Sequence, residues 1–447
     1  MTPLESTRKV IALDKARIET KISTLENDVV VATARDDTAR SVSCAICVRH
    51  GSAYEGLSGN GVSHAIEHWT LNGSKRYSFH DLARRLARIG GDLDHDLTAT
   101  THDRVSYGLK SRTFTKMRDE LLPRLTDMIL RPCDAEAPYL LEALRSIQTE
   151  SAAVSHDYVS ECAENAARNA LFPSHPVGQP VDGTPESIAS LTPAILKKMH
   201  ARYYSPGGRF IIAAAGRVRH DEFKKLATEL LGRLPQKRIN DHIPKPPIRP
   251  IGRIEVPLPR PSNKGSFLLL GWNVTPVLEN PKDLCALDLI LSILGSSCAS
   301  RLYRSLRMHA YIGYGPGAFL EVSRFHAAVF VETECFQREL KDAERICMEE
   351  ITRIRTKSVS AGEFSDFALR ERQIIREKAD DTDKLLDELV DKVIHRRPKA
   401  LFEAYRLLDP KRNLITRKDL LRVAQTYLDP ANYVVVRVEG TKPFEAA

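Results

Sequence analysis

The residues with the clearest capacity for chemistry lie in "GVSHAIEHWTLNG", residues 61–73. His64 and His68 are four residues apart, so on a helix their imidazoles lie one turn apart and can bind a single Zn²⁺. Glu67, between them, can reach a metal-bound water without ligating the metal. The apolar residues of the stretch fall on the opposite helix face, at Val62, Ala65, Ile66 and Trp69. The spacing therefore predicts a zinc site, with a solvated polar face as the alternative.

The helix with these histidines belongs to a chain long enough for two domains. The sequence has 447 residues, more than the roughly 250–300 over which one core usually grows. "LTPAILKKMHARYYSPGGRFIIAAAG", residues 191–216, matches "ITRKDLLRVAQTYLDPANYVVVRVEG", residues 415–440, at an offset of 224 residues. Each stretch has a threonine suited to cap a helix, then an amphipathic helix, a proline and a strand ending in glycine. The repeat predicts two homologous modules.

A proline-rich segment separates the two copies. Seven prolines lie between residues 244 and 261, which excludes helix and sheet interior. We therefore expect an N-terminal module at 1–233, a semi-rigid linker at 234–265 and a C-terminal module at 266–447. The predicted fold class is α+β, with an antiparallel-rich sheet and helices packed on one face in each module.

Composition excludes several classes of function. The net charge is +8, but Lys and Arg are interleaved with Asp and Glu and no nucleic-acid motif is present, so we expect no nucleic-acid binding. No apolar run is long enough for a membrane span. The N-terminus lacks a secretory apolar region, and eight scattered cysteines suit a reducing compartment, which favours the cytoplasm, with the mitochondrial matrix as the alternative. Cys44 and Cys47 form a CxxC, but on a strand they point to opposite faces and cannot share a metal.

The context of the histidines resembles a known family. HxxEH is the inverted zinc-peptidase signature, and "GSAYEGLSGNGVSHAIEHWTLNGSKRYS", "LFPSHPVGQPVDGTPESIASLT" and "ASRLYRSLRMHAYIGY" are similar to the pitrilysin (M16) metallopeptidases. The resemblance covers nearly the whole chain, and its length fits the short two-domain subfamily, which includes mitochondrial processing peptidase and complex III core subunits. It implies that His64 and His68 ligate Zn²⁺, that Glu67 is the general base, and that the chain forms half of a clamshell.

The family's third ligand is a glutamate on a later helix, usually preceded seven residues earlier by another glutamate. This chain offers Glu142 and Glu150, which are eight residues apart. Counting without gaps from Pro132 puts Thr149 in the ligand position, whereas the local match of "IQTE" selects Glu150. We expect Glu150 to ligate the metal and Glu142 to support it; in the alternative, both are surface charges and the site is incomplete.

The second half lacks HxxEH and instead carries "RMHAYIGYGPG", in which Arg307 precedes Tyr314 by seven residues. This resembles the family's Arg/Tyr pair, which holds the substrate backbone and stabilises the oxyanion. His95 and His102 lie where the family has its substrate-pairing edge strand, and we expect both to be strand or turn residues.

The resemblance predicts a zinc endopeptidase that cleaves unstructured peptides, or precursor segments, inside a chamber built from two subunits. Because this chain carries both the zinc motif and the Arg/Tyr pair, we expect a homodimer, with a heterodimer as the alternative. The competing hypothesis is a non-catalytic partner subunit, such as a respiratory-complex core protein.

Overall fold

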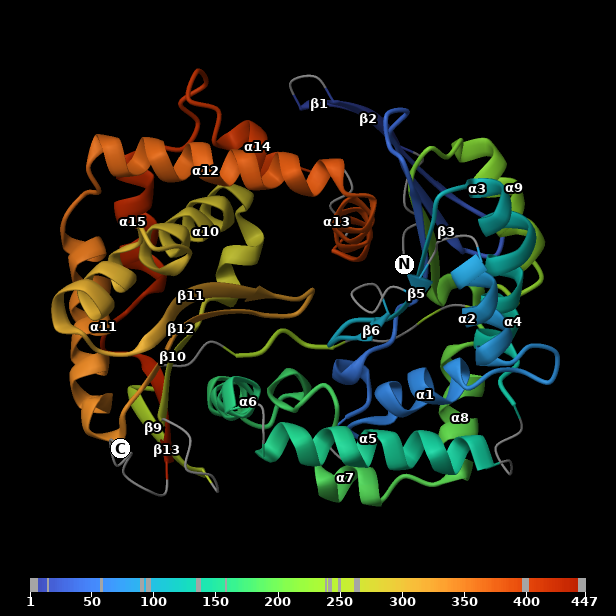
Figure 1. Ribbon diagram of the computed structural model, residues 1–447, viewed down its shortest axis with the longest axis horizontal. Helices are drawn as coiled ribbons and strands as arrows, with labels where there is room; N and C mark the ends of the chain where they lie inside the picture. The colour runs from blue at the N-terminus through green and yellow to red at the C-terminus, as the bar shows by residue number, and fades with distance from the viewer. Residues whose placement is uncertain are drawn as a thin grey trace. The chain divides into compact units, whose positions relative to one another are not determined.

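The computed structural model describes residues 7–13, 16–56, 59–88, 92–93, 98–133, 138–156, 159–237, 239, 243–247, 251–260, 266–395 and 402–440. Contacts between Cα atoms divide the chain into two compact units, each containing one β-sheet (Figure 1). The first unit comprises residues 1–151, 180–243 and 375–401. The second comprises residues 152–179, 244–374 and 402–447. The α+β class predicted from the sequence is confirmed.

The sheet of the first unit has the strand order β1-β2-β3-β8-β4-β7-β5, with β6 also paired to β7, and among the strands described only β3 and β8 are parallel neighbours. Its strands are β1 (Thr7–Leu13), β2 (Ala16–Thr24), β3 (Val30–Arg35), β4 (Val42–Val48), β5 (Asp92–Leu93), β6 (Ala99–Thr100), β7 (Val105–Ser111) and β8 (Phe210–Gly216). Its helices include α1 (Val62–Leu71), α2 (Phe79–Arg88), α3 (Phe114–Lys116), α4 (Leu122–Leu130), most of α5 (Pro138–His156), α7 (Pro185–Ala189), α8 (Pro193–Tyr203), α9 (His220–Leu231) and α13 (Thr382–Ile394).

The sheet of the second unit has the order β11-β12-β10-β13-β9, and within the described part of the chain only β13 and β9 are parallel neighbours. Its strands are β9 (Arg253–Arg260), β10 (Ser266–Asn273), β11 (Tyr314–Val322), β12 (Ala327–Cys335) and β13 (Tyr433–Gly440). Its helices include α6 (Val159–Leu171), α10 (Pro281–Gly295), the π-helical η6 (Tyr303–Ala310), α11 (Leu340–Thr356), most of α12 (Ala361–Asp380), α14 (Glu403–Leu407) and α15 (Arg417–Tyr427).

The repeat extends far beyond the two stretches that revealed it. Shifted by 224 residues, β3, β4, β7 and β8 fall inside β9, β10, β12 and β13, and α8 coincides with α15. The pairing is also the same, since β9-β13-β10-β12 repeats the order and directions of β3-β8-β4-β7. The shift places α1 inside α10, with Asp288, Leu291 and Ser292 at the positions of His64, Glu67 and His68. The second copy therefore keeps the fold but has no histidine at either position.

Part of the predicted linker is a β-strand in the structure. Strand β9 lies within the predicted linker, 234–265, and forms the outer edge of the second sheet. Prolines at 257 and 259 are compatible with this position because an edge strand needs only one side of its backbone paired. The other module boundaries remain sequence-based predictions.

The modules exchange one helix each. α6 follows the first module's strands in sequence but packs on β10 and β13, whereas α13, its counterpart 224 residues later, packs on β3, β4 and β8. Figure 1 shows α13 on one side of the first sheet and α9 on the other. Gly271 of β10 allows the close approach of α6, since a Cβ there would lie 3.3 Å from a methyl carbon of Leu171. Each sheet is therefore covered on a second face by a helix from the other module.

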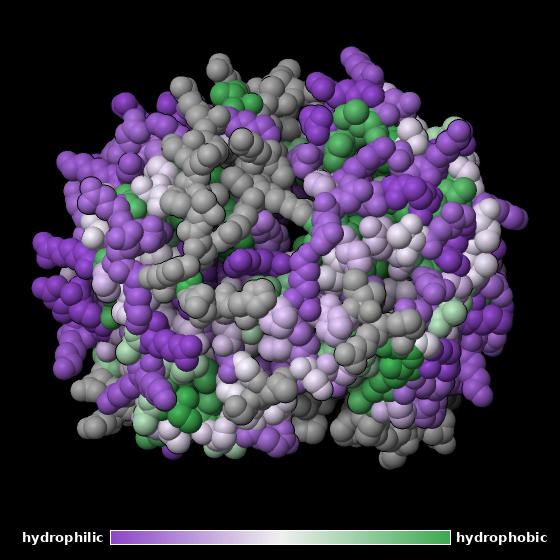
Figure 2. Space-filling view, turned by 180° about the vertical axis from the view of Figure 1, so that it is seen from behind, coloured by the Kyte–Doolittle hydropathy of each residue, from purple (hydrophilic) through white to green (hydrophobic). Residues whose placement is uncertain are grey.

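The two cysteines of the CxxC lie on opposite faces of β4, as the sequence predicted, and the surface in view is largely hydrophilic (Figure 2). Figure 2 shows hydrophilic residues over much of the face in view, with hydrophobic residues in scattered patches. Cys44 belongs to the core cluster of the first unit, while Cys47, on the opposite face of β4, accepts a hydrogen bond from Ser106. Burial raises the pKa of the Cys47 thiol to about 11. Among the residues described, no helix is both long and apolar enough to cross a bilayer.

Candidate metal centre

Helix α1 is held by its apolar face and by a capping carboxylate. Val62, Ala65, Ile66 and Trp69 all belong to the core cluster of the first unit, as the spacing predicted. The helix begins after Gly61, whose φ of +94° suits glycine, and Gly61 itself supplies no side-chain cap. Glu55 takes that role, since its carboxylate accepts hydrogen bonds from the backbone N–H groups of Gly61, at 2.7 Å, and of Ser63.

The polar face of α1 is not a solvated surface. His64 and Glu67 are only 9% and 7% exposed, and the side chain of His68 is 26% exposed. The alternative of an ordinary water-facing helix is therefore wrong, and these groups need partners.

Two histidines and one glutamate converge at this face. The Nε2 atoms of His64 and His68 lie 3.2 Å apart, and each lies 3.3 Å from Oε2 of Glu150 on α5. These three are one of the groups whose donor atoms lie close enough together to hold a metal ion. Glu142, two turns earlier on the same helix, is exposed and does not belong to the group.

The donor spacing fits zinc. Ligand atoms about 2.0–2.1 Å from Zn²⁺ at tetrahedral angles are separated by about 3.3–3.4 Å, close to the three observed distances. Two imidazole nitrogens and one carboxylate oxygen are also a donor set that zinc accepts in catalytic sites, which keep the fourth position for water or substrate. The residues present therefore fit a catalytic zinc ion.

The same arrangement perturbs the protonation of its members. Burial opposes charge on Glu150, but hydrogen bonds from His64 and His68 lower its pKa to about 2. Burial also opposes charge on His64, yet the hydrogen bond with Glu150 and the charges of Asp182 and Glu67 raise its pKa to about 9. Zinc binds neutral imidazole and ionised carboxylate, so metal binding at this cluster would compete with protonation of His64.

Glu67 has one strong polar partner. The hydroxyl of Thr100, on β6, donates to Oε2 of Glu67 at 2.6 Å. Burial raises the pKa of Glu67, while this hydrogen bond opposes the increase. Since β6 and β5 pair with β7 at the edge of the sheet, the carboxylate lies beside an edge strand.

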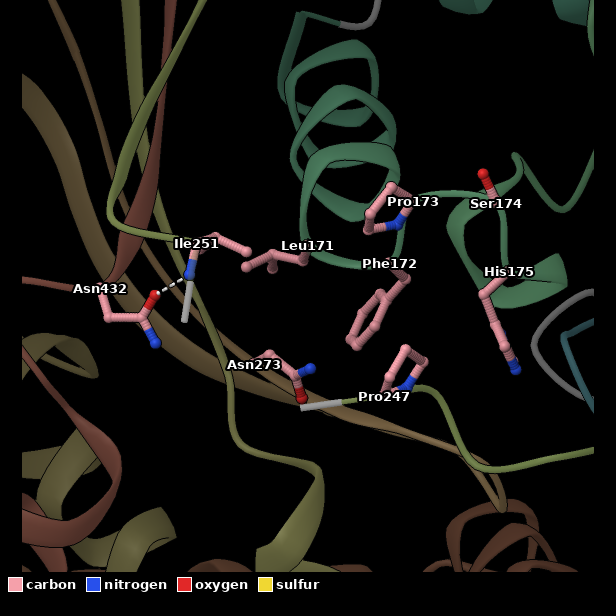
Figure 3. A pocket seen from close by; sticks show the side chains of 9 residues that line it. All are labelled: Leu171, Phe172, Pro173, Ser174, His175, Pro247, Ile251, Asn273 and Asn432. Atoms are coloured by element: carbon pink, nitrogen blue, oxygen red, sulfur yellow. Dashed lines mark hydrogen bonds between the residues drawn. The ribbon is translucent and has the colours of Figure 1, made fainter. Parts of the chain in front are cut away.

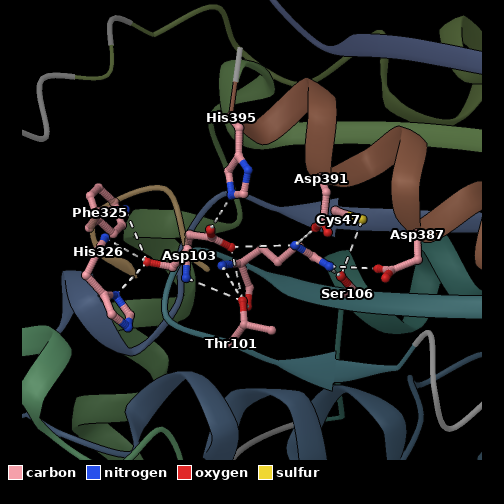
Figure 4. Close-up of polar contacts among 11 residues, drawn as sticks. Cys47, Thr101, Asp103, Ser106, Phe325, His326, Asp387, Asp391 and His395 are labelled. Atoms are coloured by element: carbon pink, nitrogen blue, oxygen red, sulfur yellow. Dashed lines mark hydrogen bonds and ion pairs between the residues drawn. The ribbon is translucent and has the colours of Figure 1, made fainter. Parts of the chain in front are cut away.

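An ion-pair network around the largely buried Arg104 anchors the turn that follows β6. Arg104 lies 2.9 Å from Asp387 and 2.5 Å from Asp391, both on α13. Asp103 approaches His395 at 3.5 Å, and Thr101 donates to Asp103 at 3.1 Å (Figure 4). Helix α13, which comes from the second module, therefore fixes the turn next to the residue that contacts Glu67.

The remaining predicted residues lie elsewhere. Arg307 and Tyr314 belong to the second unit, where the guanidinium of Arg307 lies 5.5 Å from the centre of the Tyr314 ring and donates to the carbonyl of Gly313 at 2.7 Å. Tyr314 is 71% exposed, so its hydroxyl is accessible. His102 is buried in the turn between β6 and β7, as predicted, and pairs with Ser52 at 2.9 Å. His95 lies outside the described residues.

The sequence did not indicate three residues that the structure brings to this site: Glu55, Thr100 and Asp182. Glu55 precedes the helix by seven residues, so it could have been considered as a cap. Thr100 and Asp182 reach the site from a distant strand and a distant loop, and no local pattern marks them.

The second unit contains a separate cavity of about 380 Å³ (Figure 3). Its walls are mainly apolar, and two of the polar side chains there form hydrogen bonds with the protein backbone. The side-chain oxygen of Asn432 accepts from the N–H of Ile251 at 2.7 Å, and Nε2 of His175 pairs with the carbonyl of Pro244 at 2.9 Å. These contacts fix the segment before β9 against the sheet.

The chain is similar to known proteins in sequence and in fold. Residues 30–185 match the family described as Insulinase (Peptidase family M16), and residues 190–367 match Peptidase M16 inactive domain. An uncharacterized zinc protease of Mycobacterium leprae is 27% identical over 345 residues, which are 76% of this chain and 75% of that protein. An uncharacterized zinc protease of Bacillus subtilis is 26% identical over 296 residues, 65% of this chain and 68% of that protein.

Solved structures show the same architecture. A protease from Helicobacter pylori superimposes with a TM-score of 0.82 at 15% identity, covering 94% of this chain and 99% of that one. The first half of the Escherichia coli periplasmic protease PqqL gives 0.73 at 16% identity, with 94% and 92% covered. The fold is therefore that of the two-module M16-like peptidases. The chain belongs to the M16 peptidase family.

Proposed function

We propose that this protein is a zinc-dependent endopeptidase that cleaves unstructured peptides. The convergence of His64, His68 and Glu150 at zinc-ligand spacing, with Glu67 on the same helix face, carries this proposal. The competing hypothesis of a non-catalytic partner subunit rests on the spacing of Glu142 and Glu150, which is one residue longer than the family's. A complete donor set favours the enzyme.

Each residue of the site has a distinct task in this reaction. When bound, zinc polarises the peptide carbonyl and acidifies the attacking water. Glu67 accepts the proton of that water and later delivers it to the leaving amine nitrogen. Thr100 holds one carboxylate oxygen of Glu67, which directs the other towards the reacting atoms. Burial of Glu67 excludes bulk water from the base.

The edge of the first sheet suggests how a substrate is held. β5 and β6 lie at this edge, and Thr100 of β6 touches Glu67. An extended peptide that adds to such an edge satisfies its backbone hydrogen bonds whatever its sequence. Only a chain free of its own secondary structure can pair in this way, which supports unstructured peptides as the substrate class.

A second subunit completes the proposed chamber. The superposition on full-length PqqL includes 97% of this chain but only 48% of PqqL. PqqL is therefore about as long as two such chains. Arg307 and Tyr314 are proposed to serve the zinc site of the other copy in a homodimer, with a heterodimer as the alternative.

The central experiment is Glu67→Gln. We expect the variant to retain one zinc per chain but to lose about 10²- to 10⁴-fold in turnover of an unstructured peptide, because an amide cannot accept the proton. Glu142→Gln serves as the control, since this carboxylate is exposed and outside the donor group. Purified wild-type protein without zinc, or with no peptidase activity that depends on Glu67, would favour the non-catalytic hypothesis.

The sharing of sites is tested by mixing. Glu67→Gln and Tyr314→Phe should each be weak alone, but their mixture should recover about a quarter of wild-type activity. Half of the randomly exchanged dimers are then mixed, and each mixed dimer has one intact site. A mixture no more active than its parents, once exchange is verified, would show that the pair acts within one chain or not at all.

A further inference from the structure

The imidazole of His64 has two edges with different surroundings. Nε2 faces His68 and Glu150. Nδ1 is buried and has no hydrogen-bond partner among the residues described. A carboxylate oxygen of Asp182 lies 3.5 Å from this nitrogen, just beyond a well-formed hydrogen bond.

The backbone at Asp182 is docked firmly against the start of α1. The side chain of Asn60 donates to the carbonyl of Pro180 at 2.7 Å. A Cβ on Gly183, whose φ is +87°, would lie only 3.0 Å from Cα of Gly61, so the two glycines permit direct backbone contact. A capping box between Thr184 and Ser187 then begins α7. These contacts place Asp182 at a defined position beside His64.

The chemistry of the ring gives Asp182 a task. A neutral imidazole that ligates a metal through Nε2 carries its proton on Nδ1, and a buried N–H needs an acceptor. Asp182 approaches the edge of the ring opposite Nε2, so it is placed to accept this hydrogen bond and not to ligate the same ion. Shortening of this N···O distance to about 3 Å would complete the hydrogen bond.

We propose that Asp182 is a positioning residue for the zinc site. It accepts a hydrogen bond from Nδ1 of His64, which fixes the tautomer and the orientation of the ring for metal binding. This inference rests on the proposed zinc site. Asp182 does not touch the reacting atoms, and its effect is on the affinity for the metal.

The test measures zinc affinity by competition with a chelator at fixed pH, which is a readout independent of peptidase activity. Asp182→Ala and Asp182→Val remove the acceptor, and loss of such an outer partner should weaken zinc binding by about 10- to 100-fold. Asp182→Asn keeps an acceptor oxygen and should lose less affinity than either. Glu186→Gln removes an exposed charge four residues further on and should bind zinc as the wild type does.

The outcomes are separable. Wild-type protein that fails to bind zinc would refute the proposed function itself. Tight wild-type binding that persists within twofold in Asp182→Ala or Asp182→Val would overturn only the role of Asp182. Equal weakening in Glu186→Gln would also overturn it, because a general charge effect would then explain the loss. The unfolding midpoints of the zinc-free proteins show whether Asp182→Ala or Asp182→Val keeps the wild-type stability. The zinc affinity of the variant that keeps it decides the role of Asp182.

Discussion

The hydrogen bond from Thr100 to Glu67 offers a direct test of how the general base is held. The donor is 2.6 Å from a carboxylate oxygen, and Glu67 is 7% exposed, so water cannot readily replace the hydroxyl. Thr100→Val removes the donor but keeps the branched shape that suits a strand. Pairing of residue 100 with Val105 uses the backbone and should persist.

The size of the effect follows from the strength of this bond. A hydrogen bond to a charged group contributes about 1.5–3 kcal/mol, and removal of one partner leaves the other buried and unsatisfied. Each 1.36 kcal/mol in the activation free energy changes the rate about tenfold. If the bond is needed in the transition state, kcat/KM should fall by about 13- to 160-fold.

The assay is steady-state cleavage of an internally quenched, unstructured peptide by zinc-saturated enzyme, with metal content measured in parallel. Thr100→Ser keeps the hydroxyl and should retain most of the activity, while Thr100→Val should lose kcat with zinc content unchanged. In the Glu67→Gln background, Thr100→Val should add little further loss. Wild-type kcat/KM in Thr100→Val, or an equal defect in Thr100→Ser, would refute the proposed positioning of Glu67.

Two other perturbations test different parts of the first unit. Glu150→Gln should lower zinc occupancy at least tenfold more than Glu142→Gln, because only Glu150 lies among the donor atoms, and equal zinc content by elemental analysis would contradict this assignment. Burial and the charge of Asp391 raise the pKa of Asp387 to about 6, although Arg104 opposes the increase. Because the pKa is higher in the folded protein, protonated Asp387 favours the folded state. This contribution to the free energy of unfolding is fully present below about pH 4 and is lost as the pH increases through about 6. Asp387→Asn should therefore gain stability relative to the wild type between pH 5 and 7, by no more than about 1 kcal/mol since the side chain is half exposed, and parallel pH profiles in denaturant unfolding would exclude the effect.

The features predicted from the sequence are those encoded within one element. The helical spacing of Val62 and Trp69 identified the buried face of α1, and Thr192 and Thr416 were recognised as caps because capping chemistry is local. The 224-residue repeat followed from these local signals. Strand β9 was missed because prolines at 257 and 259 resemble a linker unless the strand is known to lie at an edge.

The partners of the metal site were less predictable. The local match to the family selected Glu150, although counting from Pro132 pointed to Thr149, and the structure places Glu150 beside both histidines. Thr100 and Asp182 arrive through tertiary packing of a strand and a loop, and their residue types are common on any surface. The burial of His64 also depends on elements remote in sequence, so helical spacing alone could not separate a solvated face from a metal site.

The exchange of α6 and α13 has a consequence for synthesis of the chain. The last strand of the first sheet, β8, ends at Gly216, whereas α13, the helix that covers the second face of this sheet, ends at Ile394. At about 5–20 residues per second, a ribosome needs on the order of 10–30 s to translate the intervening stretch. During this time the face of β3, β4 and β8 that awaits α13 is uncovered, so the N-terminal half emerges as an incomplete intermediate exposed to chaperones and to aggregation. Neither half of the gene should encode a self-sufficient folding unit, and the Glu67 site matures only when the C-terminal half has been made.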